Sequence, residues 1–234
     1  TLCGGQIKVV GGATSGAPVT VDKLNFEYSN NSAVLLSSGY ATVSNSIFIH
    51  NSGATYGGSI RVSAGHLTVT DCSFSYGQAT YGGGIYVATG ATALVDPTTF
   101  DHLTADYGAA AYISAGATGT FASDTFTNNT ANYSGGAIYA ADGTNLSYAT
   151  VTITGSVFGT TTLNGNHAAV AGGAIYSGNY SVLNIENAIA ASTTSATSFV
   201  GNYVSSTTGS VAGGAIYAGG NATLNLANNA GALS

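Results

Sequence analysis

Phenylalanine recurs at one fixed interval through the middle of the chain. Phe48, Phe74, Phe100 and Phe126 are evenly spaced. Each is followed, a little under half an interval later, by a second landmark, and these landmarks are Ile60, Ile85, Ala111 and Ile138. A period of about 20 to 50 residues is typical of solenoids, in which one supersecondary unit stacks on the next. The repeat therefore predicts a coiled chain with one unit per turn.

Two further units follow at wider spacing. Phe158 and Ile175 stand further apart than the landmarks of the earlier units, and so do Phe199 and Ile216. Both isoleucines lie in a Gly-Gly-Ala-Ile-Tyr run. The last two units are therefore expected to carry insertions. A second alignment places Leu163 in the phenylalanine position instead of Phe158, and the sequence leaves both open.

Short segments within each unit alternate apolar and polar residues, as in Leu67–Thr70 and Val151–Thr154. A period of two indicates strands. Turn-forming residues interrupt them shortly before the phenylalanine, namely Asn45, Asp71, Pro97 and Gly155. Helix signals are nearly absent, because the chain has no Met and glycine recurs throughout.

These features predict an all-β fold, a right-handed single-stranded parallel β-helix (β-solenoid) of about eight coils with little or no helix. Coils stacked about 4.8 Å apart place like residues above one another in interior ladders. Three ladders, and so three walls of a triangular cross-section, are expected. They consist of Phe48, Phe74, Phe100, Phe126, Phe158 and Phe199; of Val43, Val69, Val95 and Phe121; and of Ile60, Ile85, Ala111, Ile138, Ile175 and Ile216.

The length of 234 residues suits one domain. We expect irregular N-terminal coils over 1–38 and regular coils, each of about 26 residues, over 39–143. Two coils with insertions over 144–220 and an incomplete C-terminal coil over 221–234 should follow.

Charged residues make up only 5% of the chain, and the net charge is −6. With three Lys and Arg residues in total, the chain has no basic stripe for nucleic acid or anionic lipid. No apolar run approaches the length of a membrane-spanning helix, so no membrane insertion is expected. Thr1 begins without the features of a signal peptide, which suggests a secreted, extracellular protein from which the signal has been removed.

Asn-x-Ser/Thr sequons are consistent with an extracellular setting and give candidate glycosylation sites at Asn30, Asn128, Asn132, Asn145, Asn179 and Asn221. Two cysteines are too few for a disulfide scaffold. Cys72, close before Phe74, is expected to face the interior, and Cys3 is a candidate for an intermolecular disulfide.

The combination of Gly-Gly-x-Ile-Tyr with Phe-x-x-Asn, as at Phe48–Asn51, Phe126–Asn129 and Phe199–Asn202, resembles the repeat of polymorphic outer-membrane protein passengers and adhesin-like β-helix surface proteins. The resemblance covers about 39–220 and implies a fold and an extracellular, cell-surface setting. Three units depart from it and carry Gly77, Leu103 or Thr161 at the Asn position. In composition the chain is also similar to the sheaths of methanogenic archaea.

The residues offer little chemistry for an enzyme or a cofactor. A polysaccharide lyase of this fold needs a basic residue beside carboxylates, and Arg61 is the only such cation in the repeats. A hydrolase needs two paired carboxyls; the nearest candidates are Asp96, Asp101 and Asp106 with neighbouring Asp71 and Asp124, and nothing groups them. Asp71, Asp96 and Asp124 instead fit turn positions before the phenylalanine. His50 and His102 lie in one row but two coils, roughly 9.6 Å, apart, so no shared metal is expected.

Tyr86, Tyr112, Tyr139, Tyr176 and Tyr217 each directly follow the Ile or Ala landmark. They are expected to form an outward-facing aromatic stripe. Such a stripe either binds sugars or a neighbouring subunit, or only stabilises the sheet by stacking.

No obvious cap covers the two ends of the expected coil stack. Neutral, unpaired strand edges favour association, which predicts a self-assembling structural subunit of an extracellular surface layer, sheath or fibre with itself as partner. The alternative is an adhesin-type β-helix that binds glycans or a host, with glycans or other surface proteins as further partners. A polysaccharide lyase or hydrolase is the remote alternative.

Overall fold

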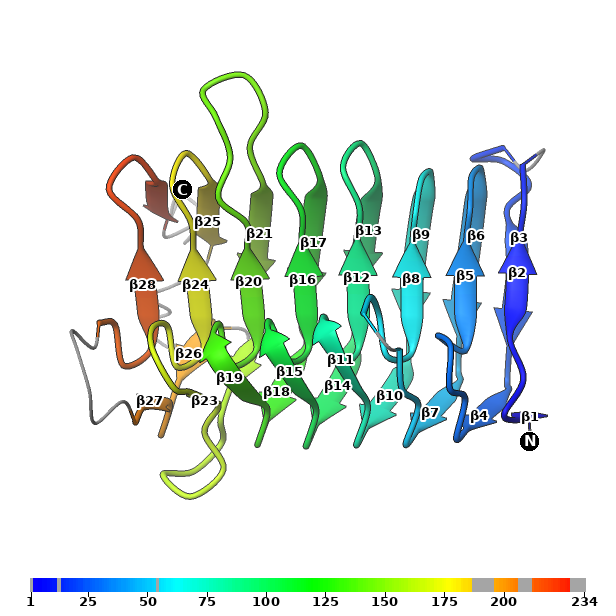
Figure 1. Ribbon diagram of the computed structural model, residues 1–234, viewed down its shortest axis with the longest axis horizontal. Helices are drawn as coiled ribbons and strands as arrows, with labels where there is room; N and C mark the ends of the chain where they lie inside the picture. Colours follow the sequence, from blue (N-terminus) through cyan, green and yellow to red (C-terminus); the bar gives the residue numbers. More distant parts are fainter. Residues whose placement is uncertain (1, 12–13, 54, 187–195, 206–211, 228–234) are drawn as a thin grey trace, which may run out of the picture.

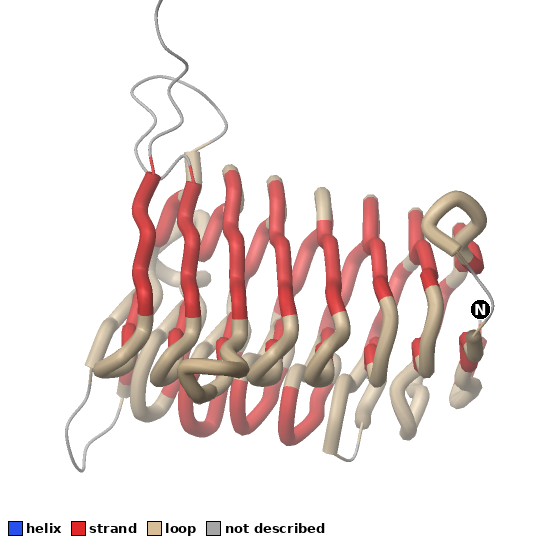
Figure 2. Tube along the Cα trace, turned by 90° about the horizontal axis from the view of Figure 1, so that it is seen from above, coloured by secondary structure: helices blue, strands red, loops and turns tan. Residues whose placement is uncertain are grey.

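The computed structural model describes residues 2–11, 14–53, 55–186, 196–205 and 212–227. These residues form strands and turns and no helix, so none of them forms a helix that could cross a bilayer. The chain winds into a rod of stacked coils, and equivalent strands of successive coils lie side by side (Figure 1, Figure 2). The predicted parallel β-helix of about eight coils is confirmed.

The phenylalanine sheet contains one strand from each of eight coils. Its strands are β1 (Leu2–Cys3), β4 (Asn25–Glu27), β7 (Ile47–Ile49), β10 (Cys72–Ser75), β14 (Thr98–Asp101), β18 (Thr125–Thr127), β22 (Val157–Phe158) and β26 (Ser198–Phe199). Seven rings stack with centroids 4.5 to 5.0 Å apart, those of Phe26, Phe48, Phe74, Phe100, Phe126, Phe158 and Phe199. Phe158 pairs with Phe126 while Leu163 is 93% exposed, so the alignment with Leu163 in the ladder is wrong.

The isoleucine sheet forms a second wall, also of eight strands. They are β2 (Ile7–Val9), β5 (Val34–Leu36), β8 (Ile60–Val62), β12 (Ile85–Val87), β16 (Ala111–Ile113), β20 (Ile138–Ala140), β24 (Ile175–Ser177) and β28 (Ile216–Ala218). The predicted ladder from Ile60 to Ile216 is in register. Where Ala111 replaces isoleucine, Ile113 stands next to Val87 in the adjacent ladder and offsets part of the lost volume.

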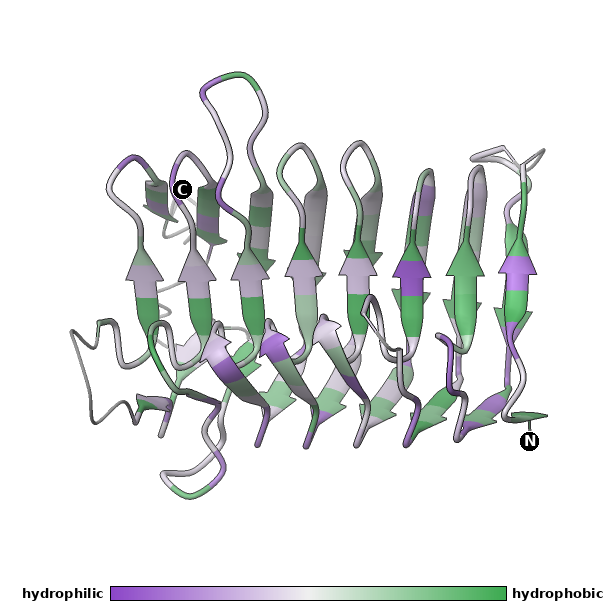
Figure 3. Ribbon diagram, in the orientation of Figure 1, coloured by the Kyte–Doolittle hydropathy of each residue, from purple (hydrophilic) through white to green (hydrophobic). Residues whose placement is uncertain are grey.

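The long-strand sheet is the third wall. Its strands are β3 (Val19–Asp22), β6 (Tyr40–Ser44), β9 (His66–Thr70), β13 (Thr92–Val95), β17 (Thr118–Ala122), β21 (Thr150–Thr154), β25 (Val182–Glu186) and β29 (Thr223–Ala227). Val43, Val69, Val95 and Phe121 stack as expected. Phe121 fits because Gly119 stands beside it, where a Cβ atom would meet the Phe121 ring and Ile113. Figure 3 shows the alternation of hydrophobic and hydrophilic residues along these strands.

A fourth, short sheet was not expected, and three walls are therefore too few. It contains β11 (Gln78–Tyr81), β15 (Thr104–Tyr107), β19 (Thr130–Ser134), β23 (His167–Ala168) and β27 (Tyr203–Val204). Within each coil it lies between the phenylalanine and isoleucine sheets. Ala105, Ala131 and Ala168 form its buried side, and their small side chains bring this sheet close to the core.

The corners of the coil are made by residues with left-handed backbone. Before the phenylalanine strand this residue is Lys23, Asn45, Asp71, Ser123 or Gly155, with φ between 48° and 59°. Before the isoleucine strand it is glycine in each repeat from Gly57 to Gly213. At Gly82, for example, φ is +67° and a Cβ atom would meet the Ile85 carbonyl oxygen. Glycine is needed at this second corner for both conformation and space.

A ladder of buried asparagines closes the corner after the phenylalanine strand. Asn129 donates from Nδ2 to the Phe100 carbonyl oxygen at 3.0 Å and accepts from the Leu103 N–H at 3.0 Å. Asn166 donates from Nδ2 to the Phe126 carbonyl oxygen at 3.0 Å and to Asn202 Oδ1 at 2.9 Å, and its own Oδ1 accepts from the Asn129 amide at 2.8 Å. The Asn position of the fifth unit is thus filled by Asn166, and the assignment of Thr161 to it is wrong.

The fifth unit separates its ladder residues by inserted turns, while the strands stay in register. A hairpin closed between Thr144 and Ser147 precedes β21, and a turn over 159–165 separates Phe158 from Asn166. These two insertions project at opposite edges of the rod (Figure 1). Within 1–38, strands β1 to β5 pair with the following coil in the same register. The inserted segments 187–195 and 206–211 and the C-terminal 228–234 lie outside the described residues.

Candidate binding surface

Two columns of tyrosines run along the corner between the short sheet and the isoleucine sheet. The first is the expected stripe, and its rings stack with centroids 4.5 to 5.6 Å apart in the order Tyr86, Tyr112, Tyr139, Tyr176 and Tyr217. The second was not expected and contains Tyr56, Tyr81, Tyr107 and Tyr133, with centroids 5.1 to 5.7 Å apart. Its signal in the sequence is a tyrosine directly or closely before the first four glycine corners, from Gly57 to Gly135.

The two columns contact one another edge to face. Tyr81 meets Tyr112 at 5.0 Å and Tyr107 meets Tyr139 at 5.2 Å, both at an interplanar angle of 68°. Within each column the ring faces cover each other, so that mainly ring edges and hydroxyl groups reach solvent. Tyr139 is only 9% exposed. The columns therefore offer a ligand few open ring faces, and stacking of neighbouring coils is their evident effect.

The electrostatics of the columns agree with a packed, uncharged surface. Burial, followed by the neighbouring tyrosines and Asp142, raises the pKa of the Tyr139 phenol, and burial likewise raises that of Tyr112. Arg61 occupies the stripe position one coil before Tyr86, and its guanidinium carbon lies 4.9 Å from the centroid of the Tyr56 ring. This cation–π contact ends the aromatic row on that side.

A third aromatic row lies at the corner after the phenylalanine sheet. Tyr28, His50, Tyr76 and His102 stack with centroids 5.0 to 5.2 Å apart, as their common offset from the phenylalanine suggested. The ring of Tyr76 separates the two histidines. No group of three or more metal-ligating side chains occurs among the described residues.

The acidic residues are dispersed over several environments. Asp71 and Asp96 are exposed at turns. Asp101 bonds His102 at 2.7 Å, and although burial alone would raise the pKa of its carboxyl, the hydrogen bonds from Asn128, Thr127 and His102 lower it. Asp106 accepts from the Asn132 amide at 2.8 Å on the short sheet.

Asp124 lies at the turn before β18, where a turn residue was expected, but its side chain is buried. It is 0% exposed, and its carboxyl oxygens have no hydrogen-bond partner among the described residues. Burial raises the pKa of this carboxyl to about 9, and the nearby backbone of Thr98 and Ala122 offsets only a part of that rise. It is therefore a neutral carboxylic acid at pH 7, but one enclosed in the coil and out of reach of a substrate.

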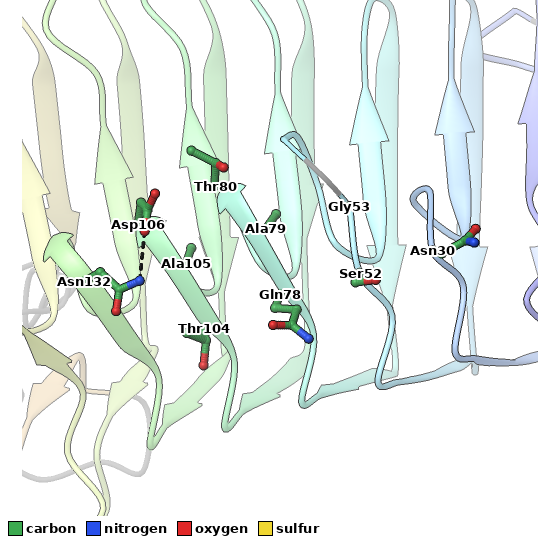
Figure 4. A pocket seen from close by; sticks show the side chains of 10 residues that line it. All are labelled: Asn30, Ser52, Gly53, Gln78, Ala79, Thr80, Thr104, Ala105, Asp106 and Asn132. Carbon is green, nitrogen blue, oxygen red and sulfur yellow. Dashed lines mark hydrogen bonds between the residues drawn. The ribbon is translucent and has the colours of Figure 1, made fainter.

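The outer face of the short sheet is hollowed into a recess of about 440 Å³. Figure 4 shows its lining side chains, which come from β11, β15 and β19 and from the turns of the two preceding coils. They are Asn30, Ser52, Gly53, Gln78, Ala79, Thr80, Thr104, Ala105, Asp106 and Asn132. We call this recess the short-sheet groove. Nothing in the sequence alone brought these residues together, because they belong to five different coils.

The six sequons differ in how freely their asparagine side chains are presented. Asn30, Asn132, Asn145, Asn179 and Asn221 are exposed. Asn128 is half-buried, and its amide donates to Asp101 at 2.8 Å. Asn145 lies in the projecting hairpin, away from the sheets.

Both cysteines are free thiols. Cys72 is buried, as expected, and its thiol donates to the Thr70 carbonyl oxygen at 3.2 Å. Burial raises the pKa of this thiol to about 11. Cys3 is exposed in β1, in the register of Glu27.

Comparison with known families agrees with this geometry. Residues 8–108 match the family model of the right-handed beta helix region, and 125–141 and 160–178 match the Chlamydia polymorphic membrane protein repeat. The second pair of matches contains the Asn ladder and the Gly-Gly-Ala-Ile-Tyr corners. No curated protein and no solved structure matches the chain significantly. The chain thus carries a right-handed parallel β-helix region together with repeats of the polymorphic membrane protein type.

Proposed function

We propose that this chain is a non-enzymatic structural protein of the cell surface, a passenger-type β-helix that associates with further copies of itself. The repeats of the polymorphic membrane protein type support the surface setting. The stacked ladders support the structural role, since one apolar column continues through seven phenylalanines without interruption. Such a column stiffens the rod and leaves its sides polar and nearly uncharged.

The observation that carries the proposal of self-association is the state of the ladders in the outermost described coils. Leu224 and Leu226 continue interior ladders of the long-strand sheet, yet they are 39% and 63% exposed. On the opposite side Leu2 and Val19 continue the phenylalanine and long-strand ladders and are 38% and 40% exposed. The first coil of a second copy would extend the same ladders and pair with these edge strands.

The scarcity of charge favours this association. Net charge far from zero keeps chains apart, and the described edges carry few charges that would oppose stacking. Subunits of an extracellular layer, sheath or fibre require such contacts. An enzymatic role is not supported by the dispersed acids, and the buried Asp124 does not reach the surface.

Electron microscopy and sedimentation of the purified chain test this proposal. We expect ordered rods or sheets whose formation depends on protein concentration. The double substitution Leu224→Lys and Leu226→Lys should abolish them, because it places two charges in the stacking surface. The matched control is Leu146→Lys with Leu163→Lys, since these leucines are 90% and 93% exposed on the inserted turns.

Circular dichroism should show that both double variants keep their strand content. Wild-type protein that remains monomeric at all concentrations would contradict the proposal, and so would assembly that survives the Leu224 and Leu226 substitutions.

A further inference from the structure

We propose that the short-sheet groove binds a neutral, linear oligosaccharide that lies parallel to the axis of the rod. This inference goes beyond the structural role, since it assigns a ligand to a side of the rod and not to its coil edges. It depends on the shape of the groove, on its lining and on the exclusion of other ligand classes.

The shape of the groove fits an elongated ligand. Its lining residues come from five consecutive coils, which places about 19 Å between the first and last at the usual strand spacing. Its volume of about 440 Å³ falls within the range of small-molecule sites, roughly 300 to 1,000 Å³. A compact ligand would fill only one part of such a recess, whereas a chain of sugar rings follows its length.

The lining offers hydrogen bonds mainly from uncharged side chains, with Asp106 as its one acid. The amides of Asn30, Gln78 and Asn132 and the hydroxyl of Thr104 both donate and accept. Ala79 and Ala105 line the groove between these polar side chains, and because the Ala105 side chain is buried on the core side of the sheet, the backbone of β15 forms the floor there. Equivalent positions repeat once per coil, as Gln78 and Thr104 do in their register, so that hydroxyl groups of a repeating polymer meet a repeating surface.

Other ligand classes fit less well. No Lys or Arg lines the groove, and Asp106 together with the net charge of −6 repels anions. Asp106 is its only acid and is already bonded by Asn132, so a metal ion finds no second carboxylate.

A peptide also fits poorly, because it needs a strand edge that accepts a new strand or pockets for apolar anchors. Here β15 is paired on both sides by β11 and β19. The outer edge of β11 already bridges the preceding coil at Ser52 and Tyr56. No large apolar side chain lines the groove, so it has no deep apolar pocket.

Titration calorimetry with defined hexasaccharides tests the inference. The probes are cellohexaose and chitohexaose, which are extended, maltohexaose, which curls, and the hexamer of galacturonate, which is anionic. We expect at least one extended neutral probe to bind, maltohexaose to bind more weakly and the anionic hexamer not to bind.

The double variant Gln78→Ala with Thr104→Ala should weaken binding by about tenfold, because it removes hydrogen-bonding groups from the centre of the groove. Both residues are exposed, so the fold should tolerate the change. The matched control, Thr120→Ala with Thr152→Ala on the outer face of the long-strand sheet, should leave the affinity within about twofold of wild type.

Absence of binding by both extended probes would overturn the inference, and so would binding that the groove variant does not change. A short apolar peptide used as a further probe should not bind, and its binding in the groove would also overturn it. Calorimetry measures oligosaccharide binding by each chain, whereas microscopy and sedimentation measure self-association. A negative result for oligosaccharide binding is therefore distinguishable from a negative result for self-association.

Discussion

The phenylalanine ladder and the row that stands just before it differ sharply, although both contribute one buried side chain per coil. The ladder repeats a single residue type. The preceding row, which we call the corner row, consists of Ser46, Cys72, Thr98, Asp124, Ser156 and Thr197, all of them at most 5% exposed. Identical apolar rings need only to be stacked, whereas each polar member of the corner row needs its own hydrogen-bond partners.

Some members of the corner row meet this need and others do not. Ser46 donates to the Ser44 carbonyl oxygen at 2.7 Å, and its hydroxyl accepts from the Leu24 N–H at 3.1 Å. Ser156 repeats this arrangement with Thr154 and Asp124. The Thr98 hydroxyl and both Asp124 carboxyl oxygens have no partner among the described residues. The comparison indicates that the phenylalanine ladder contributes most to the stability of the fold. The corner row makes the free energy of unfolding depend on pH, because it contains the buried carboxyl of Asp124.

The largest expected effect comes from interrupting the ladder. Phe100→Ala should lower the free energy of unfolding by roughly 3 to 5 kcal/mol, because it opens a cavity between two stacked rings. Urea denaturation followed by circular dichroism measures this loss. Thr99→Ala, on the exposed side of the same strand, is the control and should change stability by less than about 0.5 kcal/mol. Equal effects of the two substitutions would contradict the importance of the ladder.

Asp124 should make stability depend on pH. Its folded-state pKa of about 9 lies above the ordinary value of 3.8, so the folded protein holds a proton that the unfolded chain releases. The stabilisation is complete below about pH 4 and is lost as pH rises towards 9, at up to about 1.4 kcal/mol per pH unit.

Asp124→Ser places in this coil the residue that Ser46 and Ser156 provide in others. We expect it to flatten the pH profile, so that it raises the free energy of unfolding by several kcal/mol at pH 8 and by much less near pH 4. Denaturation at several pH values measures both effects. Asp96→Ser, at an exposed turn, should leave the slope of the profile as in wild type. A wild-type profile without a decline between pH 4 and pH 9 would refute the assignment of a buried neutral acid.

The smallest effect is expected at Cys72, whose thiol already has a partner. Cys72→Ser should change stability by no more than about 1 kcal/mol, since serine keeps the hydrogen bond to Thr70. In native wild-type protein a thiol reagent should modify Cys3 and not Cys72, because burial raises the pKa of the Cys72 thiol to about 11. Modification of both thiols at equal rates in the folded state would show that the corner row is open to solvent.

The interior ladders could be predicted from the sequence because they repeat at a constant interval. The even spacing of phenylalanine and the Gly-Gly corners each reflect a requirement that recurs in every coil. The short sheet was missed, since its strands are brief and Ala79-Thr80 or Ala105-Asp106 shows little contrast between its two sides. With the short sheet, the second tyrosine column and the groove were also missed.

Asp124 shows how one position decides the environment of a side chain. Asp71 occupies the exposed left-handed corner before Phe74, where φ is 51°. Asp124 stands one position nearer to its own phenylalanine, Phe126, and in an extended strand a shift of one residue turns the side chain to the opposite face. The common prediction of a turn residue for both aspartates therefore did not separate the exposed carboxyl of Asp71 from the buried carboxyl of Asp124. The groove, in contrast, depends on residues of five coils, and no local pattern indicates such a site.

The inserted turn between Phe158 and Asn166 adds residues at the side of the rod and leaves the stacking of coils along its axis unchanged. Phe158 keeps its ring in the apolar column and Asn166 keeps its place in the amide ladder, although the segment between them is much longer than that between Phe126 and Asn129. Extra residues at a corner thus make the rod wider there, while the spacing between neighbouring coils stays the same. Epitopes or tags can be inserted at corners of this kind. The coil that carries such a segment would then fix its position along the axis of the rod.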